Sequence, residues 1–181
     1  GKTTTAYLLK ECLETAGINT AQIGTTGVIA QGYKQEKNLT TPDAVTIQKL
    51  LRSLVNDGFT HVVMEVSSHA LHQLRVSNVH FDVAIFTNLT PEHLDYHKTM
   101  EDYFKTKSTL FDLLKEKNGK AIINYDDDYG KKLVSSINYD ITLFSKTDST
   151  KSSFSKINDY KNKIDGIIKS DKSSYKIKSN L

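Results

Sequence analysis

Short runs of aliphatic and β-branched residues alternate along the chain with longer amphipathic stretches. The short runs predict strands at residues 20–25, 61–66, 83–88, 121–124 and 141–144. The longer stretches predict helices at residues 3–16, 43–57, 100–115 and 128–137. Gly17 fits the position just after the first helix, and Pro42 with Asp43 fits the start of the second. This alternation is typical of an α/β fold in which helices flank a mostly parallel sheet.

The pattern changes toward the C-terminal end. Residues 147–162 are polar and rich in Ser and Lys, which predicts a loop or an excursion. Residues 164–169 and 174–178 flank a polar turn and are expected to form a hairpin. Residues 146–181 hold nine lysines and four aspartates but no arginine, within a chain of net charge +3. Lysines scattered among Ser and Asn favour a solvated surface, so no nucleic-acid partner is expected.

Composition and length place the chain among ordinary globular domains. Its 181 residues suffice for one domain, with 38% hydrophobic and 25% charged residues. No apolar run approaches the ~20 residues that a membrane helix needs. The single cysteine, Cys12, excludes an internal disulfide and fits a reducing, cytoplasmic compartment. Because Cys12 lies between Leu9 and Leu13 in a helical pattern, we expect a buried structural thiol.

The first four residues, Gly1, Lys2, Thr3 and Thr4, match the second half of a phosphate-binding loop that opens a helix. Such a loop uses a lysine ammonium on the outer phosphates, a hydroxyl on Mg²⁺ and free backbone N–H groups. The alternative is a helix that happens to begin with a solvated lysine. In P-loop folds a buried strand and a glycine-rich turn come before this motif, and we expect both to be absent from this chain.

A carboxylate ends the second predicted strand. Glu65 stands at that end, with Ser67, Ser68 and His69 after it. Ligands of parallel sheets bind beyond the carboxyl ends of the strands, where a glutamate can hold Mg²⁺. Equally open is a helix cap, in which a serine starts a helix and Glu65 faces its N-terminal dipole.

The segment after the third predicted strand, residues 87–97, is also dense in polar groups. His93 is a candidate metal ligand because it is crowded with Asn88 and Asp95. An isolated histidine in a loop is more often a surface residue, and that is the expectation for the three others (His61, His72 and His80).

The predicted helix at residues 100–115 contains an anomalous lysine. Tyr103, Leu110 and Phe111 define one apolar face, and Lys107 falls in the middle of it, whereas Lys105 points away. A buried lysine is costly and therefore usually has a function. The alternative is a side chain whose stem is buried and whose ammonium reaches solvent.

Several multi-residue motifs in the same order resemble the Mur ligases, most closely the branch that adds the third residue to UDP-N-acetylmuramoyl-dipeptide. The resemblance runs to about Asp128 and continues more weakly after it. The matching segments are residues 65–71 with Gln73 and Arg75, residues 87–97, residues 100–103 with Lys107, and residues 124–128.

The resemblance implies a role for each matching residue. Gly1, Lys2, Thr3 and Thr4 would bind ATP, with Asn88 and Asn124 also in the cofactor site. Thr3 and Glu65 would hold a first Mg²⁺, and His93 with a carbamylated Lys107 would hold a second metal. Lys2, Glu65, His93 and Lys107 would be the catalytic residues. The substrate-binding residues would be Thr40, Thr41, Ser67, Gln73 and Arg75.

The implied reaction is the ATP-dependent formation of an amide bond through an acyl phosphate, with a UDP-N-acetylmuramoyl-peptide and an amino acid as partners. The chain would be an incomplete central domain, without the N-terminal uridine-binding and C-terminal amino-acid-binding domains. One departure is visible: relatives often carry Asn directly before Thr40, where this chain has Leu39 and places Asn38 one step earlier. The open alternatives are a sister ligase such as folylpolyglutamate synthetase and a non-catalytic nucleotide-binding module.

Overall fold

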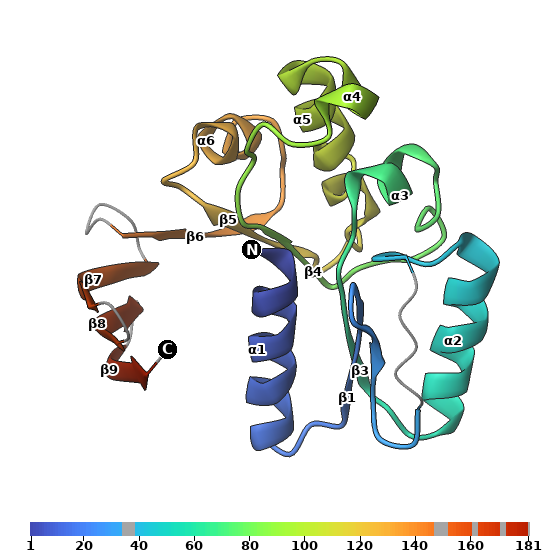
Figure 1. Ribbon diagram of the computed structural model, residues 1–181, viewed down its shortest axis with the longest axis horizontal. Helices are drawn as coiled ribbons and strands as arrows, with labels where there is room; N and C mark the ends of the chain where they lie inside the picture. The colour runs from blue at the N-terminus through green and yellow to red at the C-terminus, as the bar shows by residue number, and fades with distance from the viewer. Residues whose placement is uncertain (34–38, 147–151, 161–162, 171–172, 181) are drawn as a thin grey trace. The chain divides into compact units, whose positions relative to one another are not determined.

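The computed structural model describes residues 1–33, 39–146, 152–160, 163–170 and 173–180 (Figure 1). Asn38 therefore lies outside the described residues. The chain divides into two compact units. The first comprises Gly1–His80 with His93–Leu113, and the second Phe81–Glu92 with Leu114–Leu181.

The first unit is a small sheet with helices on both faces. Its elements are α1 (Lys2–Thr15), β1 (Thr20–Gly24), β2 (Gly27–Ile29), α2 (Ala44–Asn56), β3 (His61–Met64), α3 (Ser68–His72), α4 (Leu94–His97), α5 (Met100–Ser108) and the 3₁₀ helix η1 (Phe111–Leu113). The strand order is β2-β1-β3, with β1 antiparallel to β2 and parallel to β3. Helices α1 and α2 lie on opposite sides of this sheet (Figure 1).

Alternation along β1 divides its side chains between the two faces of the sheet. Ala21 and Ile23 form a core with Leu54 of α2 and with Phe59. Asp43 caps α2 through a hydrogen bond from the Thr46 amide, as the sequence indicated. The apolar stripe of α2 therefore faces the sheet and packs against it.

The second unit contains the second sheet. Its elements are β4 (Val83–Phe86), β5 (Lys120–Asn124), α6 (Asp128–Val134), β6 (Asp140–Ser145), β7 (Ser152–Tyr160), β8 (Lys163–Ser170) and β9 (Ser173–Asn180). The strands follow the order β4-β5-β6-β7-β8-β9. Neighbours from β4 to β7 are parallel, and β8 and β9 add an antiparallel hairpin.

The five predicted strands, the first two helices and the C-terminal hairpin are confirmed. The predicted loop at 147–162 is wrong over residues 152–160, which form β7. The predicted helix at 100–115 is also too long, because α5 ends at Ser108. At this end the Ser108 hydroxyl donates to the Phe104 carbonyl, and the Thr109 hydroxyl donates to the Thr106 carbonyl. These side-chain bonds to the backbone compete with continuation of the helix.

The prediction for Cys12 is wrong, because this thiol is exposed. The buried residues of α1 are Ala6 and Lys10, one turn apart. Lys10 is buried and forms ion pairs with the exposed carboxylates of Glu14 at 2.5 Å and Glu11 at 3.3 Å. The covered side of α1 is therefore the Ala6–Lys10 line, and Cys12 lies off it.

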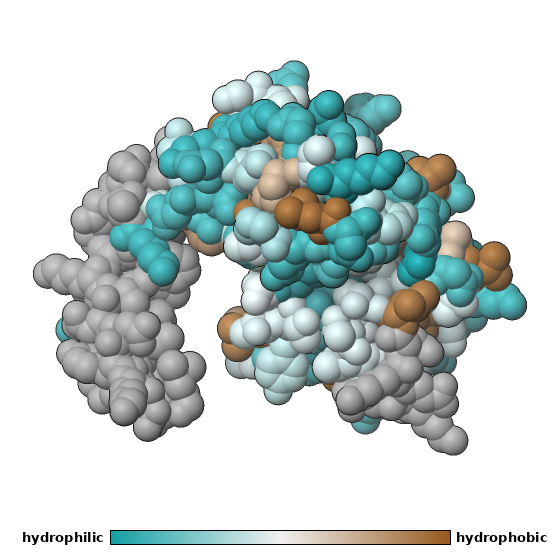
Figure 2. Space-filling view, turned by 45° about the horizontal axis from the view of Figure 1, so that its top comes forward, coloured by the Kyte–Doolittle hydropathy of each residue, from teal (hydrophilic) through white to brown (hydrophobic). Residues whose placement is uncertain are grey.

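The coloured part of the face in Figure 2 is mainly hydrophilic, with separate hydrophobic patches. Leu8, Val45, Val55 and Leu74 are among the exposed large hydrophobic residues. Scattered residues of this kind are normal on a protein surface. None of the described helices is long and apolar enough to cross a bilayer.

Candidate functional site

The N-terminus of α1 meets the carboxylate of Glu65. Gly1 is the N-cap of α1, and Lys2 is exposed in its first turn together with Thr4. The Thr3 hydroxyl donates a hydrogen bond of 2.7 Å to Oε2 of Glu65. Unpaired N–H groups and the positive end of the helix dipole favour anions at such a position. The structure thus joins an anion-binding helix end to a carboxylate 62 positions away in the chain.

Glu65 is a buried carboxylate held by uncharged donors. Its exposed fraction is 2%, and Oε1 accepts a hydrogen bond of 3.0 Å from the Thr25 amide. Among the ion pairs of the described residues, none includes Glu65. A buried carboxylate is costly without a cation nearby, and carboxylate and hydroxyl oxygens are hard ligands. Glu65 with Thr3 therefore fits a Mg²⁺ ion.

Two residues of this site, Gly24 and Thr25, were missed by the sequence analysis. A Cβ atom on Gly24 would lie 2.0 Å from Oε1 of Glu65, so only glycine leaves room for this carboxylate. Ile23 pairs with Met64 in the parallel β1–β3 ladder, so both strands end at the same edge of the sheet. A Gly-Thr pair at the end of the predicted strand 20–25 was the available signal.

The cap interpretation of Ser67 also holds. The Ser67 hydroxyl accepts a hydrogen bond of 3.2 Å from the Ala70 amide at the start of α3. Glu65 meanwhile bonds to Thr3 and Thr25 and takes no part in this cap. The cap therefore uses Ser67 and leaves the Glu65 carboxylate outside it.

Thr41 ties the loop before α2 to the turn after β3. Its fully buried hydroxyl donates to the Glu65 carbonyl at 2.8 Å and accepts from the Ser67 amide at 3.0 Å. The neighbouring Thr40 hydroxyl lies 3.1 Å from that of Thr25. The predicted substrate-binding threonines thus stand beside Glu65, with the hydroxyl of Thr41 already engaged.

Arg75 is held in one orientation at the end of α3. Its Nη1 donates to the Thr41 carbonyl at 2.8 Å, while Nε and Nη2 donate to Oε1 of Gln73 at 3.0 and 2.5 Å. A guanidinium has five N–H donors, so donors remain for a ligand. No carboxylate forms an ion pair with Arg75 among the described residues. Its orientation and charge suit an anionic substrate.

A cluster of aromatic and imidazole rings surrounds α4. His93 is exposed, precedes α4 in a left-handed conformation at φ 58°, and lies 5.1 Å from the His69 ring between centroids. The Tyr96 ring packs against His69 with centroids 4.1 Å apart and planes tilted by 38°. Burial, followed by the neighbouring His93, lowers the pKa of His69, with Asp95 acting in the opposite direction. His69 therefore favours its neutral form.

Lys107 and His93 both lie near the ring of Tyr103. The Lys107 ammonium is 5.1 Å from the centroid of the buried Tyr103 ring, and the His93 ring is 6.2 Å from it. Lys107 is half-buried, and Lys105 is exposed as predicted. Helix α5 ends one residue after Lys107.

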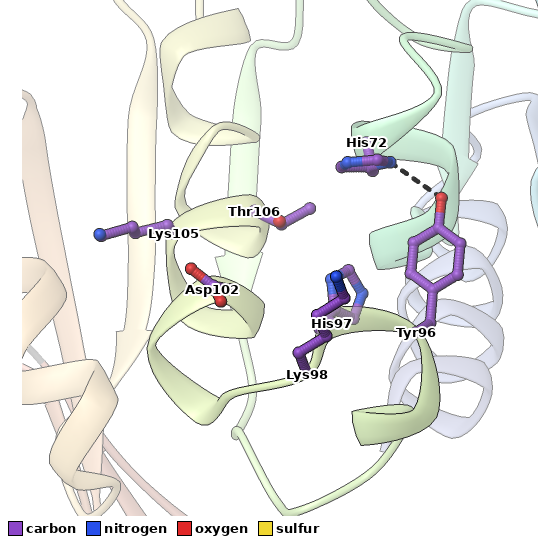
Figure 3. Close-up of a pocket in the computed structure, with 7 residues that line it drawn as sticks. All are labelled: His72, Tyr96, His97, Lys98, Asp102, Lys105 and Thr106. Carbon is purple, nitrogen blue, oxygen red and sulfur yellow. Dashed lines mark hydrogen bonds between the residues drawn. The ribbon is translucent and has the colours of Figure 1, made fainter.

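A pocket of about 340 Å³ lies among α3, α4 and α5 (Figure 3). Its lining residues are His72, Tyr96, His97, Lys98, Asp102, Lys105 and Thr106. His72 bonds through Nδ1 to the Tyr96 hydroxyl at 2.8 Å. The predicted site residues do not line this pocket. His61, His72 and His80 are exposed, as expected.

Asn88 and Asn124 belong to the second unit. Asn88 is half-buried just after β4. The Asn124 amide donates to the Thr87 carbonyl at 2.7 Å, and its oxygen accepts from the Asp126 amide at 3.0 Å. Asp127 caps α6 and also accepts from the Leu89 amide at 3.0 Å. In this unit the Asn124 side chain joins the ends of β4 and β5.

The described residues contain no group of three His, Cys, Asp or Glu side chains that could hold a metal ion. Glu65 with Thr3 therefore needs ligands from a bound phosphate or from water. His93 with an unmodified Lys107 does not fit a cation, because an ammonium repels one.

The comparisons with known proteins agree on one family. A family model of the Mur ligase middle domain matches residues 1–181. The UDP-N-acetylmuramoyl-L-alanyl-D-glutamate–2,6-diaminopimelate ligase of Agrobacterium fabrum is 48% identical over 134 residues, covering 74% of this chain and 27% of the relative. The ligase of that name from Trichormus variabilis is 49% identical over 139 residues, covering 76% of this chain and 27% of the relative.

Solved structures give the same result. A structure of a ligase with that name is 28% identical, with a TM-score of 0.85, and covers 99% of this chain and 37% of its own. The MurF ligase from Thermotoga maritima in complex with ADP is 22% identical, with a TM-score of 0.68 and coverage of 98% and 38%, and shares the fold alone. The chain thus spans about a quarter of its curated relatives. Because the family model covers the whole chain and the relatives are nearly half identical to it, the chain belongs to the Mur ligase family.

Proposed function

We propose that this chain is part of an ATP-dependent ligase that joins UDP-N-acetylmuramoyl-L-alanyl-D-glutamate to 2,6-diaminopimelate. The observation that carries the proposal is the Thr3–Glu65 hydrogen bond of 2.7 Å at the start of α1. It places a hydroxyl, a buried carboxylate and a helix N-terminus together, as binding of a magnesium nucleotide requires. The names of the relatives supply the two substrates.

The proposed reaction has two steps. The substrate carboxylate attacks the γ-phosphorus of ATP, which releases ADP and leaves an acyl phosphate. The amine of the amino acid then attacks the acyl carbon, loses a proton and expels inorganic phosphate. All groups in the first step are anionic, so Lys2 and the end of α1 would offset their repulsion, and Mg²⁺ bound by Thr3 and Glu65 would supply further positive charge.

Arg75 and Thr40 would hold the anionic peptide substrate. Arg75 is oriented by Gln73 and Thr41, so little side-chain entropy is lost when a carboxylate binds. Ser67 starts α3 beside them. Thr41, whose hydroxyl is already engaged, would act by placing Thr40 and Arg75.

A carbamylated Lys107 is the second part of the proposal. An ammonium about 4 Å from Mg²⁺ costs about 4 kcal/mol per unit charge at an effective dielectric of 20. The ammonium first loses a proton, and the neutral amine then adds CO₂ and releases a second proton. The charge changes from +1 to −1, which would turn Lys107 into a metal-binding carbamate. The Tyr103 ring would keep the lysine stem in place, and His93 would supply a nitrogen ligand. A lysine and a histidine around one ring support this arrangement.

We further propose that residues 1–181 correspond to an incomplete central domain of the enzyme. The coverage of 27% of the curated relatives supports this. The UDP-binding and amino-acid-binding domains would then lie in the remainder of the protein.

The test uses the full-length protein with ATP, Mg²⁺ and the UDP-sugar dipeptide. Diaminopimelate and lysine are supplied in parallel, and the product is identified by its mass. We expect a tripeptide product with diaminopimelate and stoichiometric phosphate release. A folate substrate with glutamate tests the sister-ligase alternative. Product from folate alone, or ATP binding without any product, would refute the proposal.

The carbamate is tested with Lys107→Ala in the same protein. We expect most activity to be lost and part of it to return with added short carboxylates or bicarbonate. Lys105→Ala is the matched control, because Lys105 is an exposed lysine on the same helix. Normal activity of Lys107→Ala would exclude the carbamate.

A further inference from the structure

His97 is a buried histidine that the proposed chemistry does not use. It is the last residue of α4, and its exposed fraction is 6%. A hydrogen bond of 2.9 Å joins its Nε2 to the hydroxyl of Ser68, which is itself buried. Its ring stacks on Tyr103, with centroids 4.8 Å apart and planes at 17°. His97 therefore contacts α3 through its edge and α5 through its face.

These two contacts reach the helices that carry the proposed site. Ser68 is the first residue of α3, between the cap residue Ser67 and the segment that ends at Arg75. Tyr103 lies one turn before Lys107 on α5 and has the Lys107 ammonium 5.1 Å from its ring centroid. One side chain thus connects the substrate-binding turn to the proposed metal-binding lysine.

An ordinary core residue would not make both contacts. A phenylalanine could stack on Tyr103 but would leave the buried Ser68 hydroxyl without its imidazole partner, which is unfavourable. A glutamine could bond to Ser68 but would not stack. A histidine satisfies both, and a satisfied buried polar contact favours one arrangement of its neighbours over others.

We propose that His97 is a positioning residue, which sets the placement of α3 relative to α5 through Ser68 and Tyr103. The inference rests on the proposed ligase function. His97 is not among the residues assigned to nucleotide, metal or peptide, so its effect should fall on the rate of the bound complex. Misplacement by about 1 Å can reduce a rate about 100-fold, so a modest shift of α5 suffices.

The chain offers a matched control at His72. This histidine also joins α3 to α4 by one hydrogen bond, from Nδ1 to the Tyr96 hydroxyl at 2.8 Å. His72 is exposed, and Figure 3 shows this bond beside the ring of His97. A general need for a histidine bridge between α3 and α4 would make the two residues equivalent.

The experiment compares four single variants and one double variant of the full-length protein. His97→Phe keeps the ring and loses the hydrogen bond, His97→Gln keeps a donor and loses the stacking, and Ser68→Ala removes the hydroxyl alone. His72→Phe is the control. For each variant, kcat and the KM values for ATP and for the UDP-sugar dipeptide are measured well below the unfolding temperature.

We expect His97→Phe and Ser68→Ala each to lower kcat about tenfold, with both KM values within about twofold of the wild type. His97→Gln should fall as well, through the lost stacking. The double variant His97→Phe with Ser68→Ala should be no slower than either single variant, because both remove the same bond. His72→Phe should match the wild type.

Three results would overturn the inference while leaving the proposed function intact. The first is a wild-type kcat in the His97→Phe and Ser68→Ala variants of an active protein. The second is a double variant in which the losses of kcat from Ser68→Ala and His97→Phe multiply. The third is a loss of kcat in His72→Phe equal to that in His97→Phe. If His97→Phe does not fold, Ser68→Ala decides by the same criteria. A wild-type protein without ligase activity would overturn both the proposed function and the role of His97.

Discussion

Replacing Gly24 with alanine should displace the carboxylate of Glu65. The added Cβ atom would lie 2.0 Å from Oε1, whereas ordinary contacts begin at 3.4 Å, so the carboxylate must move by about 1.4 Å. Its bonds from Thr3 at 2.7 Å and from the Thr25 amide at 3.0 Å cannot survive that shift. Gly24 is not among the glycines with positive φ, so alanine introduces no backbone strain.

The cost follows from the two bonds lost. Hydrogen bonds to a charged group contribute about 1.5–3 kcal/mol each, so we expect Gly24→Ala to lower the free energy of unfolding by about 3 kcal/mol. Urea unfolding of the chain measures this value. In the full-length protein, the same variant should need more Mg²⁺ for half-maximal activity, because the carboxylate no longer meets Thr3.

A double-mutant cycle with Glu65→Ala isolates the cause. Without the carboxylate, the new methyl group meets no obstacle, so Gly24→Ala should cost almost nothing in the Glu65→Ala background. Additive effects to within about 0.5 kcal/mol would show that the two residues act independently and would refute the steric reasoning. Wild-type stability of Gly24→Ala would refute it as well.

Other predictions follow from single observations. Both side-chain amide atoms of the fully buried Gln22 lack a hydrogen-bond partner among the described residues. Gln22→Met should therefore raise the free energy of unfolding, measured in urea, by about 1–2 kcal/mol. A destabilised variant would contradict this. Burial, followed by nearby histidines, lowers the pKa of His97. Below about pH 6.5 the unfolded chain therefore binds more protons than the folded chain. The free energy of unfolding should fall as the pH decreases through that value, and it should fall less steeply in His97→Phe. Equal slopes of stability against pH in the two proteins would exclude His97 as the source. In the full-length enzyme, Arg75→Ala should raise the KM for the UDP-sugar dipeptide and leave that for ATP nearly unchanged, whereas equal changes would indicate a general structural role. The 181-residue chain alone should release no phosphate from ATP in the presence of substrate, as a phosphate-release assay can check.

The sequence alone determined the order and type of most elements. Hydrophobic runs at β1, β3 and β4 are short and bounded by polar residues, so their period and length identified them as strands. Asp43 identified the start of α2 because its side chain bonds the helix's own first turn, which is a local interaction. Thr3 and Glu65 were candidates because they stand at a helix start and a strand end that the sequence could locate. Lys107 was a candidate because it falls on the apolar face of a predicted helix.

The tertiary structure decided which of these residues meet. The contacts of Glu65 with Thr3 and Thr25 depend on the packing of α1 and β1 against β3, so local pattern could not reveal that Gly24 must be glycine. Strand β7 is polar and forms through its pairing with β6 and β8, which carries no periodic signal. Periodicity likewise placed Cys12 on an apolar side of α1, whereas the side that is covered runs through Ala6 and Lys10. The exposure of Cys12 and the burial of Lys10 beside Glu14 follow from that packing, because a nonlocal contact chooses the face that becomes interior.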